Sequence, residues 1–259
     1  MAEVKKAFHI TPVMRTIRGG YYSMYCIRYA GNGQILASSP VSFDIKIIPV
    51  EDRLPTTLST KSLPIFLTPF EGSILYTDQK CIRKIDGEGD EIFLVLEGDL
   101  RGIQYIGPNI IFVCTSSRVE KYTTSGEKLL KIEHDELGNQ IYKDPQNISI
   151  NRNGDICVAE YDETGNNEPL LTVVDQFGKY RFSYPPTPSG SPMDICCDSY
   201  CHIIIACRLI HVIDNDGNFL RYLNYDGIQE ACSVTIDSED NLFVSQLNDT
   251  CIRIMRSMC

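Results

Sequence analysis

The sequence predicts an all-β protein, a six-bladed β-propeller of four-stranded blades that is closed by an N-terminal strand. Three observations lead to this fold: a short apolar run recurs about every forty residues, a glycine marks the turn between the last two strands of several repeats, and no long apolar run has helical spacing. With 259 residues and an apolar content of 43%, the chain can bury a large core. We expect a single domain over residues 1–259.

The repeat is defined by a short apolar run that follows a polar turn. It occurs six times, with spacings of 39, 36, 46, 47 and 39 residues. Its first residues are Gln34, Ser73, Asn109, Asp155, His202 and Asn241. A strand candidate precedes each run and further candidates follow, so each repeat supplies four short strands. This pattern is typical of a β-propeller, in which every blade buries its faces against its neighbours.

The repeat also predicts where the blades begin and how the ring closes. We expect blade starts near residues 23, 62, 101, 145, 192 and 231. A tight hairpin turn with a positive φ between the third and fourth strands is expected at Gly89, Gly126, Gly178 and Gly217. The sixth repeat ends after its third strand, and a strand within residues 7–18 supplies the missing fourth one. This pairing removes two open sheet edges.

Residues 194–214 raise the question of a zinc site, because they hold four cysteines and two histidines: Cys196, Cys197, Cys201, His202, Cys207 and His211. A zinc site brings four ligands to one ion, usually through closely spaced cysteine pairs. In the expected strands, Cys196 and Cys197 point to opposite faces, and Cys207 lies a whole strand away from Cys201. We interpret the segment as blade five, and we expect no metal and no cofactor.

The charge of the chain limits its partners. The net charge is −10; residues 1–130 carry 15 basic and 14 acidic side chains, whereas residues 131–259 carry 9 and 20. Because nucleic-acid affinity normally comes from a surplus of Lys and Arg, any such surface would be a local patch in the N-terminal half. No segment has the roughly 20 apolar residues of a membrane span, and the N-terminus has no apolar signal region. We expect a cytoplasmic protein without a membrane or DNA partner.

Two segments carry a resemblance to a known family: "EHDELGNQIYKDPQNISINRNGDICVAE" and "VVDQFGKYRFSYPPTPSGSPMDICCDSYCHIIIACRLIHVIDNDGNFLRYL". They resemble the NHL-repeat propeller and are similar in particular to the C-terminal region of invertebrate, molluscan-type tripartite-motif proteins. Blade four keeps most of the family pattern, with Pro145, Ile150, Gly154 and the turn at Gly178. Cys201 and Asp240 stand where the family has a turn glycine.

The resemblance implies a binding module that holds a protein or single-stranded RNA on one face of the disc. In full-length relatives a RING finger, B-boxes and a coiled coil precede the propeller and supply ubiquitin-ligase activity. The sequence contains no paired cysteine series of a RING finger and no heptad run. We therefore expect a substrate-reading part of such a system, or a propeller that acts alone, and not an enzyme.

The binding face is expected where the loops between strands two and three lie together with the loops between blades. It would bind a protein partner. Alternatively, it would bind single-stranded RNA, with Arg and Lys on phosphates and Tyr stacked on bases. The candidate residues are Arg53, Lys61, Lys80, Arg101, Arg118, Tyr142, Lys143, Tyr161 and Arg208.

A lesser alternative is a metal-dependent hydrolase with an ion in the central channel. A calcium ion takes roughly six to eight oxygen ligands. The position eight residues before each second strand is occupied by Cys26, Ile65, Arg101, Asn147, Asp194 and Ser233. Only Asn147 and Asp194 are strong oxygen donors, so they are the candidate channel-metal residues. The sequence has neither a serine nucleophile elbow nor a phosphate-binding loop.

Overall fold

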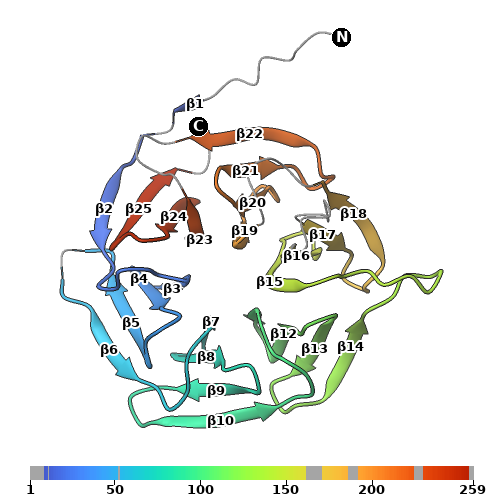
Figure 1. Cartoon of the computed structure of the whole chain (residues 1–259), viewed down its shortest axis with the longest axis horizontal. Helices are drawn as coiled ribbons and strands as arrows, with labels where there is room; N and C mark the ends of the chain where they lie inside the picture. Colours follow the sequence, from blue (N-terminus) through green and yellow to red (C-terminus); the bar gives the residue numbers. More distant parts are fainter. Residues whose placement is uncertain are drawn as a thin grey trace.

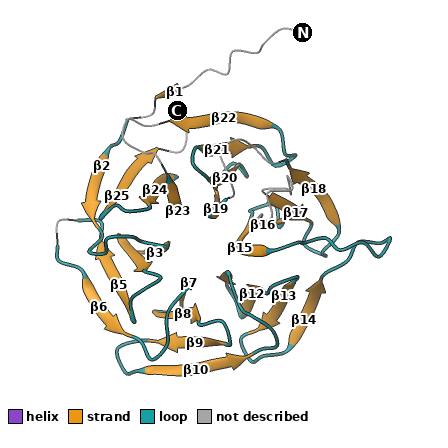
Figure 2. Cartoon of the chain, viewed as in Figure 1, coloured by secondary structure: helices purple, strands orange, loops and turns teal. Residues whose placement is uncertain are grey.

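The fold is a ring of six antiparallel sheets, and it confirms the predicted six-bladed β-propeller (Figure 1). The computed structural model describes residues 9–10, 12–51, 53–161, 171–185, 192–224 and 230–256. Within these ranges there are strands and loops but no helix (Figure 2). In the same part of the chain, nothing helical is long and apolar enough to cross a membrane.

The first three blades follow one another along the chain, each with its first strand at the centre of the ring. Blade one consists of β3 (Cys26–Gly31), β4 (Gln34–Ser38), β5 (Asp44–Pro49) and β6 (Thr56–Ser59). Blade two consists of β7 (Phe66–Phe70), β8 (Ser73–Thr77), β9 (Cys81–Ile85) and β10 (Asp90–Val95). Blade three consists of β11 (Ile103–Ile106), β12 (Ile110–Cys114), β13 (Val119–Thr123) and β14 (Lys128–Ile132).

The other three blades complete the ring in the same manner. Blade four consists of β15 (Pro145–Ile150), β16 (Ile156–Glu160), β17 (Leu171–Val174) and β18 (Tyr180–Tyr184). Blade five consists of β19 (Asp194–Cys197), β20 (Ile203–Ala206), β21 (Ile210–Ile213) and β22 (Phe219–Asn224). Blade six consists of β23 (Ala231–Ile236), β24 (Asn241–Gln246), β25 (Cys251–Arg256) and the N-terminal β2 (Arg15–Arg18).

Ring closure joins the two ends of the described chain, as expected. Strand β2 pairs antiparallel with β25, with Arg15 opposite Ile254 and Arg18 opposite Cys251. A further short strand, β1 (His9–Ile10), pairs in parallel with the outer strand β22 of blade five; the sequence did not indicate this pairing. Blade six therefore holds the beginning and the end of the ring together.

The hydrophobic core lies between neighbouring blades. Between blades four and five, Ile203 and Ile205 of β20 pack against Cys157 and Leu171, and all four side chains are fully buried. Similar clusters fill the spaces between the other blades. Because each blade is covered on both faces, its middle strands are apolar throughout instead of alternating.

Aspartate residues shape the hairpins between the third and fourth strands. The Asp175 carboxylate accepts hydrogen bonds of 2.9 Å from the backbone N–H groups of Phe177 and Lys179, and Gly178 takes a φ of 87°. Asp214 and Gly217 repeat the arrangement in blade five, with a φ of 86° at the glycine. The expectation of positive φ is also confirmed at Gly126, but it is wrong at Gly89, where Asp86 caps the turn without left-handed backbone.

Gly102 marks a close approach between blades three and four at the channel. Its N–H donates a 2.8 Å hydrogen bond to the carbonyl of Gln146. A Cβ at this position would lie 2.6 Å from the Cα of Asn147 and 2.7 Å from the carbonyl oxygen of Gln146. Because both neighbours are backbone atoms, they cannot turn away, so the two blades approach each other only with glycine here.

We expect Gly102→Ala to lower the free energy of unfolding by about 1–3 kcal/mol, since the added methyl group overpacks the blade interface. The matched control is Gly87→Ala, because a Cβ on Gly87 meets nothing within 4 Å. Urea unfolding of the two variants tests the expectation. Equal losses of stability in both variants would contradict it.

Candidate functional site in the channel and on the upper face

The inner strands β3, β7, β11, β15, β19 and β23 lie around the axis of the ring, and we call the space between them the central channel (Figure 1). We call the side with the loops between strands two and three, and between blades, the upper face; the opposite side is the lower face. A cavity of about 300 Å³ lies at each channel mouth. All six inner strands line the lower one, whereas residues near the starts of the inner strands of blades one to four line the upper one.

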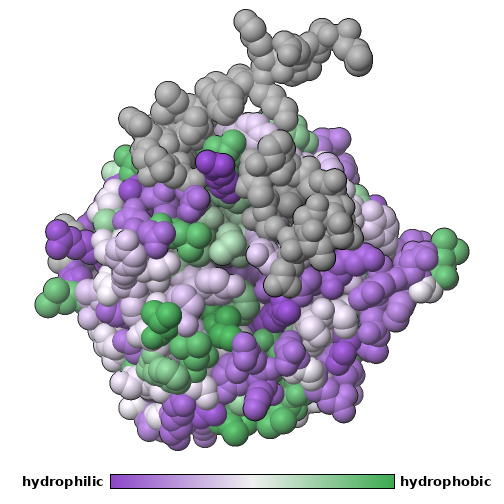
Figure 3. Space-filling model, viewed as in Figure 1, coloured by the Kyte–Doolittle hydropathy of each residue, from purple (hydrophilic) through white to green (hydrophobic). Residues whose placement is uncertain are grey.

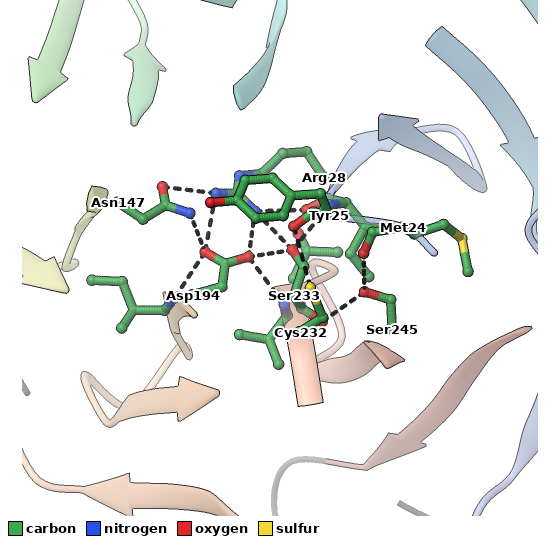
Figure 4. A network of polar contacts seen from close by, with 12 residues as sticks. Met24, Tyr25, Arg28, Asn147, Asp194, Cys232, Ser233 and Ser245 are labelled. Atoms are coloured by element: carbon green, nitrogen blue, oxygen red, sulfur yellow. Dashed lines mark hydrogen bonds and ion pairs between the residues drawn. The ribbon is translucent and has the colours of Figure 1, made fainter. Parts of the chain in front are cut away.

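A buried ion pair lies in the channel between these mouths and joins blade one to blade five (Figure 4). The Arg28 guanidinium on β3 donates two hydrogen bonds to the Asp194 carboxylate at the start of β19, at 2.8 and 3.1 Å. The Arg28 side chain is 14% exposed and that of Asp194 only 1%. Burial by itself lowers the pKa of Arg28, but the charge and hydrogen bonds of Asp194 outweigh it and hold this pKa above its ordinary value.

The Asp194 carboxylate is also bonded to groups from three further places in the ring. It accepts hydrogen bonds from the side chains of Asn147 (2.5 Å) and Ser233. It further accepts the backbone N–H groups of Ile195 and Val234, at 2.8 and 3.1 Å. One carboxylate thus links the inner strands of blades one, four, five and six, and its acceptor positions are fully used.

The inner strands are joined elsewhere by polar side chains that accept a backbone N–H of the next blade. Thr68 accepts from Tyr105, and Gln104 accepts from Ile150, at 3.0 and 2.7 Å. Across the ring closure, Ser233 accepts the N–H of Ile27 at 2.9 Å. This explains why polar residues lie in strands that are otherwise apolar: a buried N–H without a partner would be costly.

The channel brings together the two predicted metal ligands, but both bind a protein cation, the Arg28 guanidinium. Asn147 donates through its amide nitrogen to Asp194 and accepts through its oxygen from Arg28, at 3.0 Å. Of the other inward positions, Cys26 and Arg101 do not join this network: Cys26 packs into the core and Arg101 pairs with Asp144. The guanidinium takes the place among the oxygens that a metal ion would need. Within the described ranges, no three acidic, cysteine or histidine side chains are grouped as metal ligands.

Arg28 is the residue that the sequence analysis missed. It follows the counted position Cys26 by two residues, so both lie on the same side of β3. The available signal was an arginine within an otherwise apolar inner strand, "CIRYA". A charge at such a position needs a buried partner.

The upper face carries most of the predicted binding residues. Lys80, Arg118, Tyr161 and Arg208 follow second strands, and Lys61, Arg101 and Lys143 lie between blades. Of these, Lys61, Lys80, Lys143, Tyr161 and Arg208 are exposed. Arg101 and Arg118 are already paired, with Asp144 at 2.8 Å and with buried Glu120 at 2.9 Å.

Two predicted binding residues are corrected by the structure. Tyr142 is fully buried, because its loop folds back and places the ring in the core between blades three and four, next to Cys114 and Ile148. It is not available for stacking on a base. Arg53 lies between β5 and β6, the third and fourth strands of blade one, and therefore belongs to the lower face, where it pairs with Glu51 at 2.8 Å.

The upper face also presents apolar residues that the sequence analysis did not single out. Tyr22, Val41 and Phe43 are 70%, 85% and 61% exposed. Tyr22 lies in the loop between β2 and β3, and the other two lie between β4 and β5. Apolar colour is gathered between blades one and two in the space-filling view of this face (Figure 3). The loop sequence "SSPVSFD" could have indicated this surface, because apolar residues in a turn are not needed for the core.

The thiols of the cysteine-rich segment do not converge on one point. Cys196 packs into the cluster between blades five and six, whereas Cys197 contacts the cluster between blades four and five. Cys201 lies in the β19–β20 turn with a φ of 67°, and Cys207 is buried after β20. Cys201 and Asp240, which replace the expected turn glycines, thus adopt the left-handed backbone themselves.

Arg28→Met and Asp194→Asn are each expected to lower the free energy of unfolding by about 3–5 kcal/mol, because each leaves a buried partner uncompensated. The double variant should lose less than the sum of the two. Urea unfolding and a double-mutant cycle measure this coupling. Arg53→Met serves as the control, because its ion pair with Glu51 is exposed and its loss should leave stability unchanged. Strict additivity of the channel variants would contradict the proposed coupling.

Comparison with known proteins adds the fold class but no family. No family profile and no curated protein matches the chain. A gluconolactonase from Xanthomonas campestris is 12% identical with a TM-score of 0.71; the match covers 92% of this chain and 88% of that one. The WD40 propeller domain of Doa1 is 11% identical with a TM-score of 0.66, over 95% and 96% of the two chains.

A third similar structure is virginiamycin B lyase from Staphylococcus aureus. It is 16% identical with a TM-score of 0.65, and the match covers 90% of this chain and 81% of that one. The three proteins share a ring of blades but differ in what their names say they do. At such identities the likeness establishes a β-propeller fold and carries no activity with it.

Proposed function

We propose that the chain is a non-catalytic interaction module that binds a protein partner on its upper face. The observation that carries this proposal is the exposed apolar group of Tyr22, Val41 and Phe43, in two loops of neighbouring blades. Exposed apolar patches with a polar rim are typical of protein-binding surfaces. The group is called the apolar patch below.

The loops that carry the apolar patch are fixed to each other and to the blades. The Tyr21 hydroxyl donates to the carbonyl and carboxylate oxygens of Asp44, at 2.9 and 2.7 Å. Lys46 donates to the carbonyl of Gly20 at 2.7 Å. Phe43 itself accepts a 2.9 Å hydrogen bond from the N–H of Thr60. A surface fixed in this way loses little conformational entropy when a partner binds.

One basic residue, Lys61, follows a residue bonded to the apolar patch, although the chain is acidic overall. Lys61 directly follows Thr60, which is bonded to Phe43. Against a net charge of −10, a lysine at this place favours a partner segment with an apolar anchor and an acidic neighbour.

The finer assignment to the NHL-repeat type, as in tripartite-motif proteins, is part of this proposal. Its support is a turn that recurs between the third and fourth strands. In this turn an aspartate is followed three residues later by a glycine with a positive φ, as at Asp175 and Gly178 and at Asp214 and Gly217. On this proposal, the chain reads a substrate for a ubiquitin-ligase system in the cytoplasm. The apolar patch would be the reading surface.

The two alternatives have weaker support. RNA binding would use Arg101, Arg118 and Tyr142, but the arginines are paired with carboxylates and the tyrosine is buried. A channel hydrolase has the gluconolactonase likeness in its favour. Against it, Arg28 lies among the oxygens of Asn147 and Asp194, which a channel ion would need.

Phe43→Asp is expected to weaken partner binding by about 30-fold or more, the loss typical of a central aromatic anchor of about 2 kcal/mol. The probes are peptides selected from a random displayed library on the wild-type chain, with affinities measured by fluorescence anisotropy. Leu54→Asp is the matched control, because Leu54 is 90% exposed in the same blade but lies on the lower face.

Selected peptides should be rich in apolar and acidic residues and should bind Leu54→Asp as well as wild type. Peptides that bind Phe43→Asp undiminished would refute the apolar patch as the binding surface. A single-stranded RNA pool is measured in parallel at low and high salt. Tight, salt-sensitive RNA binding would replace the protein-binding proposal with the RNA alternative.

A further inference from the structure

Two cysteines from neighbouring blades meet on the lower side of the propeller. Cys157 lies on β16 of blade four and Cys197 on β19 of blade five. Their sulfur atoms are 4.0 Å apart, and 40 residues of chain separate the two positions. A disulfide needs a sulfur–sulfur distance of about 2.0 Å, so only a small approach of two side chains separates this contact from a covalent bond.

The two thiols differ in access. Cys157 is fully buried, whereas Cys197 is half-buried and lines the cavity of about 300 Å³ at the lower channel mouth. A small oxidant that enters this cavity therefore reaches Cys197 and not Cys157. The neighbouring Cys196 lines the same cavity but is buried in the cluster between blades five and six, on the other side of β19 from Cys157.

The proton of Cys157 is held firmly in the resting state. The hydrogen bond with Cys197 raises the pKa of Cys157 well above its ordinary value, and burial raises it further. Because the thiolate is the reactive form of cysteine, Cys157 is a poor first nucleophile. The order of events follows from this difference: Cys197 reacts with the oxidant, and Cys157 then completes the bond.

We propose that Cys157 and Cys197 form a reversible disulfide between blades four and five when the protein meets a peroxide. The Cys197 thiolate attacks one oxygen of hydrogen peroxide and the O–O bond breaks, which leaves a sulfenic acid on Cys197 and releases hydroxide. The hydroxide takes up the proton that the Cys197 thiol had lost and becomes the first water. The Cys157 sulfur then attacks the sulfenic sulfur, the S–O bond breaks, and the Cys157 proton leaves with the oxygen as water. Two thiols are oxidised, and one peroxide is reduced to two waters.

The disulfide would link blades four and five covalently, close to the internal ion pair of the ring. Cys197 ends the short strand that begins with Asp194, whose carboxylate holds four blades together. The disulfide also closes a long chain segment, which restricts the unfolded state. The oxidised propeller is therefore expected to resist unfolding more than the reduced one. This inference is independent of the proposed protein binding.

The experiment treats the folded full chain with dilute hydrogen peroxide and then alkylates the remaining thiols in denaturant. Oxidised wild type should lose the mass of two hydrogen atoms, alkylate at two fewer cysteines, and yield a linked pair of tryptic peptides containing Cys157 and Cys197. Its Tm should rise by roughly 5 °C, and a thiol reductant should reverse all changes.

Cys196→Ser is the matched control, because it removes the adjacent thiol but should still form the bond. Cys197→Ser should form none, and Cys157→Ala should leave a sulfenic acid that dimedone traps at Cys197. A bond to another cysteine, a disulfide-linked dimer, or oxidation of Cys197 to sulfinic acid in wild type would each overturn the proposal. The tryptic peptide that contains Cys197 also contains Cys196, Cys201 and Cys207, so fragmentation of the linked wild-type peptides assigns the bonded cysteine even if a variant does not fold.

Discussion

The carboxylate of Asp194 is the constraint on which the rest of the ring depends. It receives the Arg28 guanidinium of blade one, the Asn147 amide of blade four, the Ser233 hydroxyl of blade six and two backbone N–H groups. A propeller has no continuous core, so inner strands that converge on one point need specific links. A buried charge is costly unless it is fully paired. Because the partners of the Asp194 carboxylate come from other blades, this charge is paired only when the blades are assembled.

The sequence was sufficient to predict the architecture because a propeller is one unit repeated. Six apolar runs at similar spacing and a missing last strand led to the blades and to closure by β2. Counting back from each second strand also found Asn147 and Asp194, since equivalent positions of a repeat point the same way. This counting cannot find a side chain at a position that the repeat does not share. Arg28 is such a residue, because it reaches the network from two residues beyond the counted position on β3.

The errors on the surface have a similar physical origin. Loops carry no repeat, so their side chains are fixed by contacts with distant segments. Tyr142 is buried because residues 133–144 fold back onto blades three and four, a long-range packing event with no local pattern. The face on which a loop lies depends on which two strands of the blade it joins. Arg53 was placed on the wrong face because its loop joins the third and fourth strands, β5 and β6. The apolar patch was overlooked because single apolar residues in loops are common and become informative only when two loops meet.

The central ion pair also bears on where function resides. At the axis of the ring, the polar groups of Arg28, Asn147 and Asp194 bond to one another and hold the blades together. Evolution of such a fold toward binding would use loops, which tolerate change without disturbing the inner strands. The fixed loops of Tyr22 and Phe43 rest on blades six and one, and the network joins these blades through Ser233 and Arg28. The same network that joins the inner strands thus also fixes the blades on which these loops lie.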